Sequence, residues 1–191
     1  GELEMKEHHI TLLGKHKISY DFARSLAIDC HALDKTAYPL FFDTTYIPKS
    51  PRTIEIYNEK VSTSLLRLAI SLRTLIYQDS ETKEMFPDIS FSGIYNIGNR
   101  NDRADFDIKD VCDKIIHAED ISRVFQGKVT EVKMGGILSG FDYEKIEFPD
   151  KDPVTFISGK YKKSPWMLWI SLSSFCEGVL RWIDELEKRD I

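Results

Sequence analysis

Residues 65–75 read L-L-R-L-A-I-S-L-R-T-L, and they decide the fold class because they belong to the longest helical pattern in the chain. Apolar residues recur at three- and four-residue steps from Arg52 to Gln78, which is one face of a helix sustained for about six turns. Arg67 and Arg73 interrupt this region, and we expect them to be solvated or snorkelling side chains. The helix is predicted to be the spine of the core, with the stripe Ile54, Tyr57, Val61, Leu65, Leu68, Ala69, Leu72, Leu75 and Ile76.

A second helical pattern precedes the spine, from Ile18 to Leu33. Its apolar face is expected to comprise Ile18, Phe22, Leu26, Cys30 and Leu33. The segment from Asp34 to Pro51 then changes character, because it is rich in aromatic residues and contains Pro39, Pro48 and Pro51. Prolines oppose a continuous helix, so this segment is predicted to be a packed crossing segment.

The region after the spine is polar and broken by Pro87, Gly93 and Gly98, so residues 79–106 are predicted to form a loop. A short amphipathic helix is expected from Asp107 to Ala118, D-I-K-D-V-C-D-K-I-I-H-A, with Asp107 as its N-cap. Its apolar side would hold Ile108, Val111, Cys112, Ile115 and Ile116. A brief segment from Asp120 to Phe125 ends before Gly127.

After Gly127 the apolar period becomes two, which indicates short strands. The run from Trp166 to Leu172 is apolar on both faces and favours a central strand. A closing amphipathic helix is predicted from Ser174 to Lys188, with a Ser174–Glu177 capping box and with Gly178 at a close helix approach. The other strand candidates are residues 129–134, 137–141, 143–148 and 154–158, and residues 158–165 resemble a hairpin with a basic tip of Lys160, Lys162 and Lys163.

These patterns predict an α+β fold with a mainly helical core, a small antiparallel β-meander and a C-terminal amphipathic helix. We expect one domain over residues 1–191, in which residues 1–17 are flexible. Residues 18–126 would form the mainly helical part, and residues 127–191 would form the meander and the terminal helix.

Composition limits the classes of function. The chain has 191 residues and a formal net charge of −5, which argues against a surface devoted to nucleic-acid backbones. Cys30, Cys112 and Cys176 include no C-x-x-C pair, so we expect buried thiols in a reducing cytoplasm, without a zinc site or a disulfide framework. No segment reaches the roughly 20 apolar residues that span a bilayer, and no secretory signal pattern is present. The motifs of phosphate-binding loops, dinucleotide folds and serine nucleophiles are absent, so no cofactor is expected.

One group of residues has the chemistry of a catalytic site. An imidazole such as that of His117 can act as an acid or a base in catalysis, and Lys114 lies one helical turn before it. Arg100 and Arg103, from the preceding loop, would add contacts to a phosphate. A histidine at a helix C-terminus that interacts only with the last carbonyls and the helix dipole is the competing interpretation. The nearby acidic residues lack the spacing of a calcium loop, and capping and solvation explain them better: Asp102, Asp105, Asp107, Asp110 and Asp113.

Two stretches carry a resemblance to known proteins. C-D-K-I-I-H-A at residues 112–118, with W-M-L-W-I-S-L-S-S-F-C-E-G-V-L at residues 166–180, resembles a group of small uncharacterised bacterial proteins. More distantly, residues 18–126 are similar to the HEPN superfamily of helical bundles, many of which are RNases with a two-subunit cleft. The motif of that family is an Arg, four to six residues, then a His. Here Lys109 and Lys114 precede His117, no Arg lies at that distance, and only His117 carries over.

Two classes of function therefore stay open. The first is a non-enzymatic interaction or accessory module in a bacterial setting, which binds a protein partner or forms a homo-oligomer. It is favoured by the acidic charge, by the absence of a complete catalytic motif and by the aromatic crossing segment. The second is a metal-independent RNase in which His117 is general acid or base and in which Lys114 and Arg103 stabilise charge on the phosphate. RNA is a ligand only in this second class.

Overall fold

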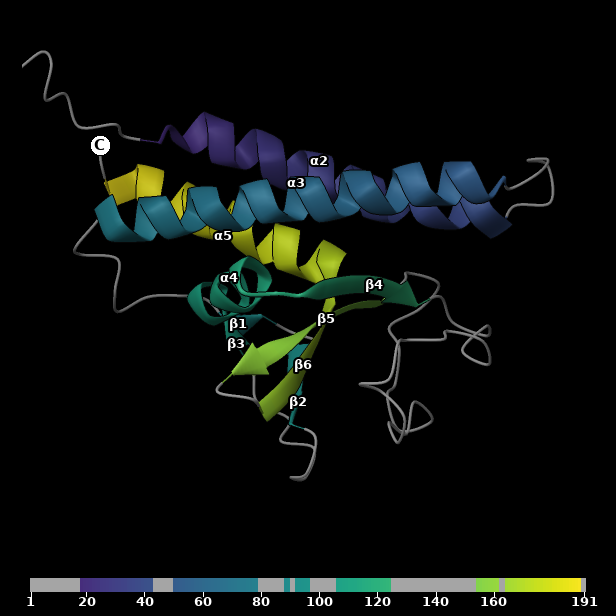
Figure 1. Ribbon diagram of the computed structural model, residues 1–191. Helices are drawn as coiled ribbons and strands as arrows, with labels where there is room; N and C mark the ends of the chain where they lie inside the picture. The colour runs from purple at the N-terminus through teal and green to yellow at the C-terminus, as the bar shows by residue number, and fades with distance from the viewer. Residues whose placement is uncertain are drawn as a thin grey trace, which may run out of the picture.

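The computed structural model describes residues 18–42, 50–78, 88–89, 92–96, 106–124, 154–161 and 164–189. Two long helices, α3 (Pro51–Gln78) and α5 (Leu172–Arg189), both pack against a third, α2 (Tyr20–Phe42). A short helix, α4 (Ile108–Ile116), and an antiparallel sheet lie below them (Figure 1). The predicted α+β class with a helical core is confirmed. None of the described helices has the length and apolar character needed to cross a membrane.

Helix α3 is the predicted spine. It begins at Pro51, where a proline loses nothing because the first N–H groups of a helix have no intrahelical acceptor. Ser50 caps this end, because its Oγ accepts a 3.1 Å hydrogen bond from the Thr53 N–H. The predicted stripe is buried from Tyr57 to Ile76, whereas Ile54 is exposed in the first turn.

Helix α2 is longer than predicted and passes through Pro39 to Phe42. A proline in the middle of a helix breaks a hydrogen bond and clashes with the preceding turn. Pro39 lies in the last turn and is exposed, so the hydrogen bond that it removes is close to the end of the helix. The crossing segment predicted from Asp34 is therefore helical as far as Phe42, and residues 43–49, with Pro48, lie outside the described part of the chain.

The buried face of α2 also differs from the prediction, because it consists mainly of small residues. Phe22 is 46% exposed, while Ala23 and Ala27 are fully buried. Small side chains allow α2 to approach both α3 and α5 closely. The buried positions of this face are Ala23, Leu26, Ala27, Cys30, Asp34 and Ala37.

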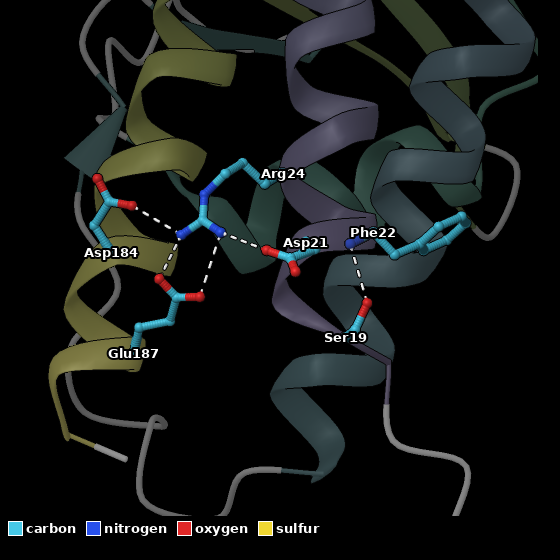
Figure 2. A network of polar contacts seen from close by, with 6 residues as sticks. All are labelled: Ser19, Asp21, Phe22, Arg24, Asp184 and Glu187. Carbon is cyan, nitrogen blue, oxygen red and sulfur yellow. Dashed lines mark hydrogen bonds and ion pairs between the residues drawn. The ribbon is translucent and has the colours of Figure 1, made fainter. Parts of the chain in front are cut away.

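Arg24 joins α2 to α5 on the exposed side of their contact, as Figure 2 shows. Its Nη2 lies 2.7 Å from Glu187 Oε2 and 3.0 Å from Asp184 Oδ1. Its Nη1 lies 3.0 Å from Asp21 Oδ1 within α2. Hydrogen bonds to Glu187 and Asp184 raise the pKa of the Arg24 guanidinium. The closing helix therefore packs back on the helical half, as predicted.

The main sheet has the strand order β2-β6-β5-β4, with all neighbours antiparallel. Strands β4 (Asp120–Val124), β5 (Val154–Tyr161) and β6 (Ser164–Ser171) form a meander, and β6 is central as predicted. The β5–β6 pairing extends as far as Tyr161, which is opposite Ser164. Lys160 of the predicted basic tip is exposed in β5, whereas Lys162, Lys163 and the strand candidates within residues 129–148 lie outside the described residues.

Several strands arise from sequence that was predicted to be loop or helix. Strand β2 (Ser92–Asn96) pairs with β6, with Ile94 opposite Leu168. Strands β1 (Asp88–Ile89) and β3 (Phe106–Asp107) pair as a two-stranded ribbon, and β4 follows α4 directly. Segments this short have no period of their own. Pairing with strands distant in the sequence stabilises them, so the interpretation of residues 18–126 as mainly helical was incomplete.

Helix α5 begins two residues earlier than predicted, immediately after β6. Ser171, rather than Ser174, caps it, because the Ser171 Oγ accepts a 3.3 Å hydrogen bond from the Ser174 N–H. Gly178 is buried, but a Cβ at this position would meet nothing within 4 Å. The expected close helix approach at Gly178 was therefore wrong. One hydrophobic cluster includes α2, α3, α4 and α5 together with residues of β5 and β6.

Candidate functional site

Helix α4 carries the residues that the sequence marked as a candidate catalytic site. The cap is confirmed: Asp107 Oδ1 accepts a 2.7 Å hydrogen bond from the Asp110 N–H. Its apolar side is buried against the core through Ile108, Val111, Cys112 and Ile115. Its polar side therefore faces outward, with Lys114 and His117 one turn apart.

His117 is the C-cap residue of α4, and its side chain is exposed. Its backbone N–H donates to the Asp113 carbonyl over 3.2 Å, which ends the helix. Its own carbonyl lies close to β5, where a Cβ at Gly159 would be 2.9 Å from that oxygen. The backbone of His117 thus has a packing role, and its imidazole remains at the surface.

Lys114 lies over the buried Trp166, with its Nζ 4.5 Å from the ring centroid. This cation–π contact fixes the ammonium group against the sheet. Partial burial lowers the pKa of the Lys114 amine, while Asp110 and Asp113 oppose that change. The side chain is therefore held by Trp166.

Arg103 belongs to the segment 97–105, which lies outside the described residues together with Arg100, Asp102 and Asp105. Of the three predicted site residues the structure thus describes Lys114 and His117. It brings them together only through their positions on one helix.

An ion pair between α3 and α4 was missed by the sequence analysis. Arg73 Nε lies 2.6 Å from Asp113 Oδ1, and Lys109 Nζ lies 3.5 Å from Asp113 Oδ2. The Arg73 guanidinium also stacks 4.8 Å from the Tyr77 ring and donates to its hydroxyl over 3.3 Å. The expectation that Arg73 is merely solvated was therefore wrong. The four-residue spacing of Arg73 and Tyr77 could have indicated their contact, but it carries no information on the ion pair with Asp113.

A buried polar cluster lies elsewhere, where α2, α3, β4 and α5 meet. We call Asp34, Tyr57, Arg123 and Ser173 the Asp34 cluster. The Arg123 Nη2 donates to Asp34 Oδ1, and the Ser173 hydroxyl and N–H donate to Asp34 Oδ2, the latter over 3.0 Å. Both ionic side chains are buried, so the Asp34 carboxylate is an internal anion at the N-terminus of α5.

Tyr57 completes the Asp34 cluster. Its hydroxyl accepts a 2.9 Å hydrogen bond from the Arg123 Nη1 and donates a 2.8 Å bond to the Leu33 carbonyl. Burial raises the pKa of the Tyr57 phenol to about 12, although the Arg123 charge acts in the opposite direction. The Arg123 Nε and the Thr155 hydroxyl are buried without a hydrogen-bond partner. The cluster is closed to solvent, so we interpret it as structural: its hydrogen bonds and its ion pair connect four elements of the fold.

The sequence offered one signal for the Asp34 cluster. Asp34 continues the series Ala23, Ala27, Cys30 at the three- and four-residue steps of the buried face. A carboxylate at such a position needs a buried partner. Arg123, 89 positions later, could not be identified as that partner without the fold.

Two further features of the described residues bear on binding. The described residues include no group of three or more His, Cys, Asp or Glu side chains that could hold a metal ion. An open groove at the surface between α2 and α3 is lined by Asp29, Ala32, Leu33, Thr36, Lys60 and Ser64.

Large apolar side chains are exposed on one face of α3. Leu66, Ile70 and Tyr77 are 39%, 49% and 75% exposed, and Ile56 is 40% exposed. At about 100° per residue these four positions fall within roughly a quarter turn of the helix, opposite the buried stripe. We call Ile56, Leu66, Ile70 and Tyr77 the outer face of α3.

Comparison with models of protein families, with curated proteins and with solved structures finds no match to this chain. The candidate site therefore rests on its own geometry.

Proposed function

We propose that this protein is a non-enzymatic interaction module that binds a protein partner through the outer face of α3. The observation that carries the proposal is the exposure of Leu66, Ile70 and Tyr77 on the same helix whose opposite face is buried core. Apolar residues scattered singly over a surface are ordinary. Several on one face of one helix are typical of a helix that packs against another protein.

The position of α3 supports this proposal. Its buried stripe runs from Tyr57 to Ile76, and it packs on both α2 and α4. The outer face is therefore presented by a helix held along most of its length. A preformed surface loses little conformational entropy when a partner binds, which favours affinity.

The charges near the predicted catalytic residues also favour a structural interpretation. Lys114 is engaged by Trp166, and Asp113 is engaged by Arg73 and Lys109. The contact with Trp166 secures α4 to the sheet, and the contact with Arg73 secures it to α3. The buried thiols of Cys30, Cys112 and Cys176 fit a reducing compartment, and we place the module in the cytoplasm.

A photoreactive amino acid placed on the outer face tests the proposal in the native cellular extract. We expect a discrete cross-linked product when it replaces Ile70. A matched control replaces Glu185, which is exposed on α5. Products of the same pattern at both positions, or none at Ile70, would contradict an interaction surface on α3.

The alternative class, a metal-independent HEPN-like RNase that uses His117, makes the opposite prediction. Such an enzyme would cleave labelled single-stranded RNA in excess EDTA and would lose that activity in His117→Ala. We expect no cleavage by either protein, and we expect His117→Ala to retain the cross-link at Ile70. Cleavage that depends on His117, with the fold unchanged, would replace the proposed function.

A further inference from the structure

We infer that the partner of the outer face of α3 is a second copy of this chain, bound antiparallel about a two-fold axis at Leu66. This inference rests on the proposed function and specifies its partner. Its first premise is the placement of two opposite charges on α3. Glu59 lies seven residues before Leu66, and Arg73 lies seven residues after it. Seven residues are close to two helical turns, so all three lie on nearly the same line along the helix.

Opposite charges at equal distances from Leu66 make the line self-complementary. When two copies of α3 cross antiparallel at Leu66, each Glu59 faces the Arg73 of the other copy, and Leu66 faces Leu66. A parallel pair would instead place Glu59 against Glu59 and Arg73 against Arg73. Like charges in contact oppose association, so the pattern selects the antiparallel pair. A two-fold interface of this kind is the commonest in homo-oligomers.

The surroundings of both charges fit this role. Glu59 is exposed on α3. Arg73 binds Asp113 through Nε and donates to the hydroxyl of the exposed residue Tyr77 through Nη2, and its side chain keeps 16% exposure beside the outer face. An arginine has five N–H donors, so it can bind carboxylates on two sides. The antiparallel register also places Ile70 against Ser62 and Thr63 of the second copy.

Disulfide trapping tests the axis directly. Copies of Leu66→Cys meet at the two-fold axis and are expected to form a linked dimer under mild oxidation. Copies of Ile70→Cys would be offset by about 12 Å along the helices, which is too far for a disulfide. The three native cysteines are buried, so they do not contribute to the linked species. Efficient cross-linking at both positions would indicate a parallel pair and would overturn the inference.

Reversal of the charge at Glu59 provides a second test of the proposed dimer. Glu59→Arg replaces two attractive contacts with two repulsive ones, and we expect the dimer dissociation constant to rise at least about tenfold. Glu185→Arg on α5 makes the same change in net charge and should leave association unchanged. Both are measured by light scattering of the purified chain.

The outcomes separate this inference from the proposed function. A wild-type chain that stays monomeric well above micromolar concentration overturns self-association. If Ile70 still cross-links a discrete different protein, the interaction module stands without the homodimer. The axis at Leu66 is also overturned if the dimer dissociation constant does not change in Glu59→Arg and the Leu66→Cys variant forms no disulfide-linked dimer.

Discussion

Gly178 and Gly159 are both buried, yet their surroundings differ. A Cβ at Gly178 would meet nothing within 4 Å, whereas a Cβ at Gly159 would lie 2.6 Å from Trp166 Cζ2. Gly178→Ala should therefore stabilise the fold by up to about 1 kcal/mol, because alanine favours the helix interior. Gly159→Ala should destabilise it by about 1–3 kcal/mol through overpacking. Urea denaturation of both variants measures the difference, and a loss of stability in Gly178→Ala would contradict the open space.

The buried Tyr57 phenol predicts how stability depends on alkaline pH. Its pKa is raised to about 12 in the folded chain, against an ordinary value of about 10. The protonated phenol therefore stabilises the fold fully below pH 10, and this contribution is lost as pH rises through 12. We expect a loss of order 2 kcal/mol from this group over that window.

Tyr57→Phe isolates the contribution of this phenol from that of the other titrating groups. The variant should be less stable at neutral pH by about 1 kcal/mol, because it lacks the hydrogen bonds to Leu33 and Arg123. Its urea midpoint should then fall less steeply than the wild-type midpoint between pH 10 and 12. Parallel curves for the two proteins would rule out an elevated Tyr57 pKa.

At the scale of elements, the Asp34 cluster joins α2, α3, β4 and α5. Removing one partner of a buried ion pair leaves an uncompensated charge, so Asp34→Asn and Arg123→Met should each cost about 3–5 kcal/mol. The double variant should cost clearly less than the sum of the two. A double-mutant cycle by urea denaturation measures this coupling.

The exposed pair Arg52–Glu55 on α3 is the matched control for this cycle. Its atoms are 3.1 Å apart, but both side chains are more than half exposed. We expect its coupling energy to be below about 1 kcal/mol. A coupling as small for Asp34 and Arg123 would show that the buried pair does not hold the elements together.

At the scale of the whole molecule, one hydrophobic cluster includes four helices and the central strands. The three tryptophans report on β6, through Trp166 and Trp169, and on α5, through Trp182. Far-ultraviolet circular dichroism reports mainly on the helices. We expect tryptophan fluorescence and circular dichroism to give coincident unfolding transitions. Two separated transitions would mean that the sheet and the helices unfold as independent units.

The candidate site was predictable to the extent that it depends on local spacing. The cap at Asp107 and the one-turn spacing of Lys114 and His117 follow from positions along one helix, and the cap is seen. The contacts that engage these residues come from elsewhere: Trp166 from β6 and Arg73 from α3. No periodicity within α4 contains that information.

The sequence by itself determined the elements whose signal is local and repeated. Helix α3, the amphipathic α4 and α5, and the apolar strand β6 each show a period long enough to identify, because one buried face must recur at the step of its backbone. The extension of α2 through Pro39, the short strands β2 and β4, and the pairing of Asp34 with Arg123 were decided only by the tertiary structure. In each of these, a contact distant in the chain outweighs a weak or contrary local preference, since burial and pairing act on residues that the sequence does not place side by side.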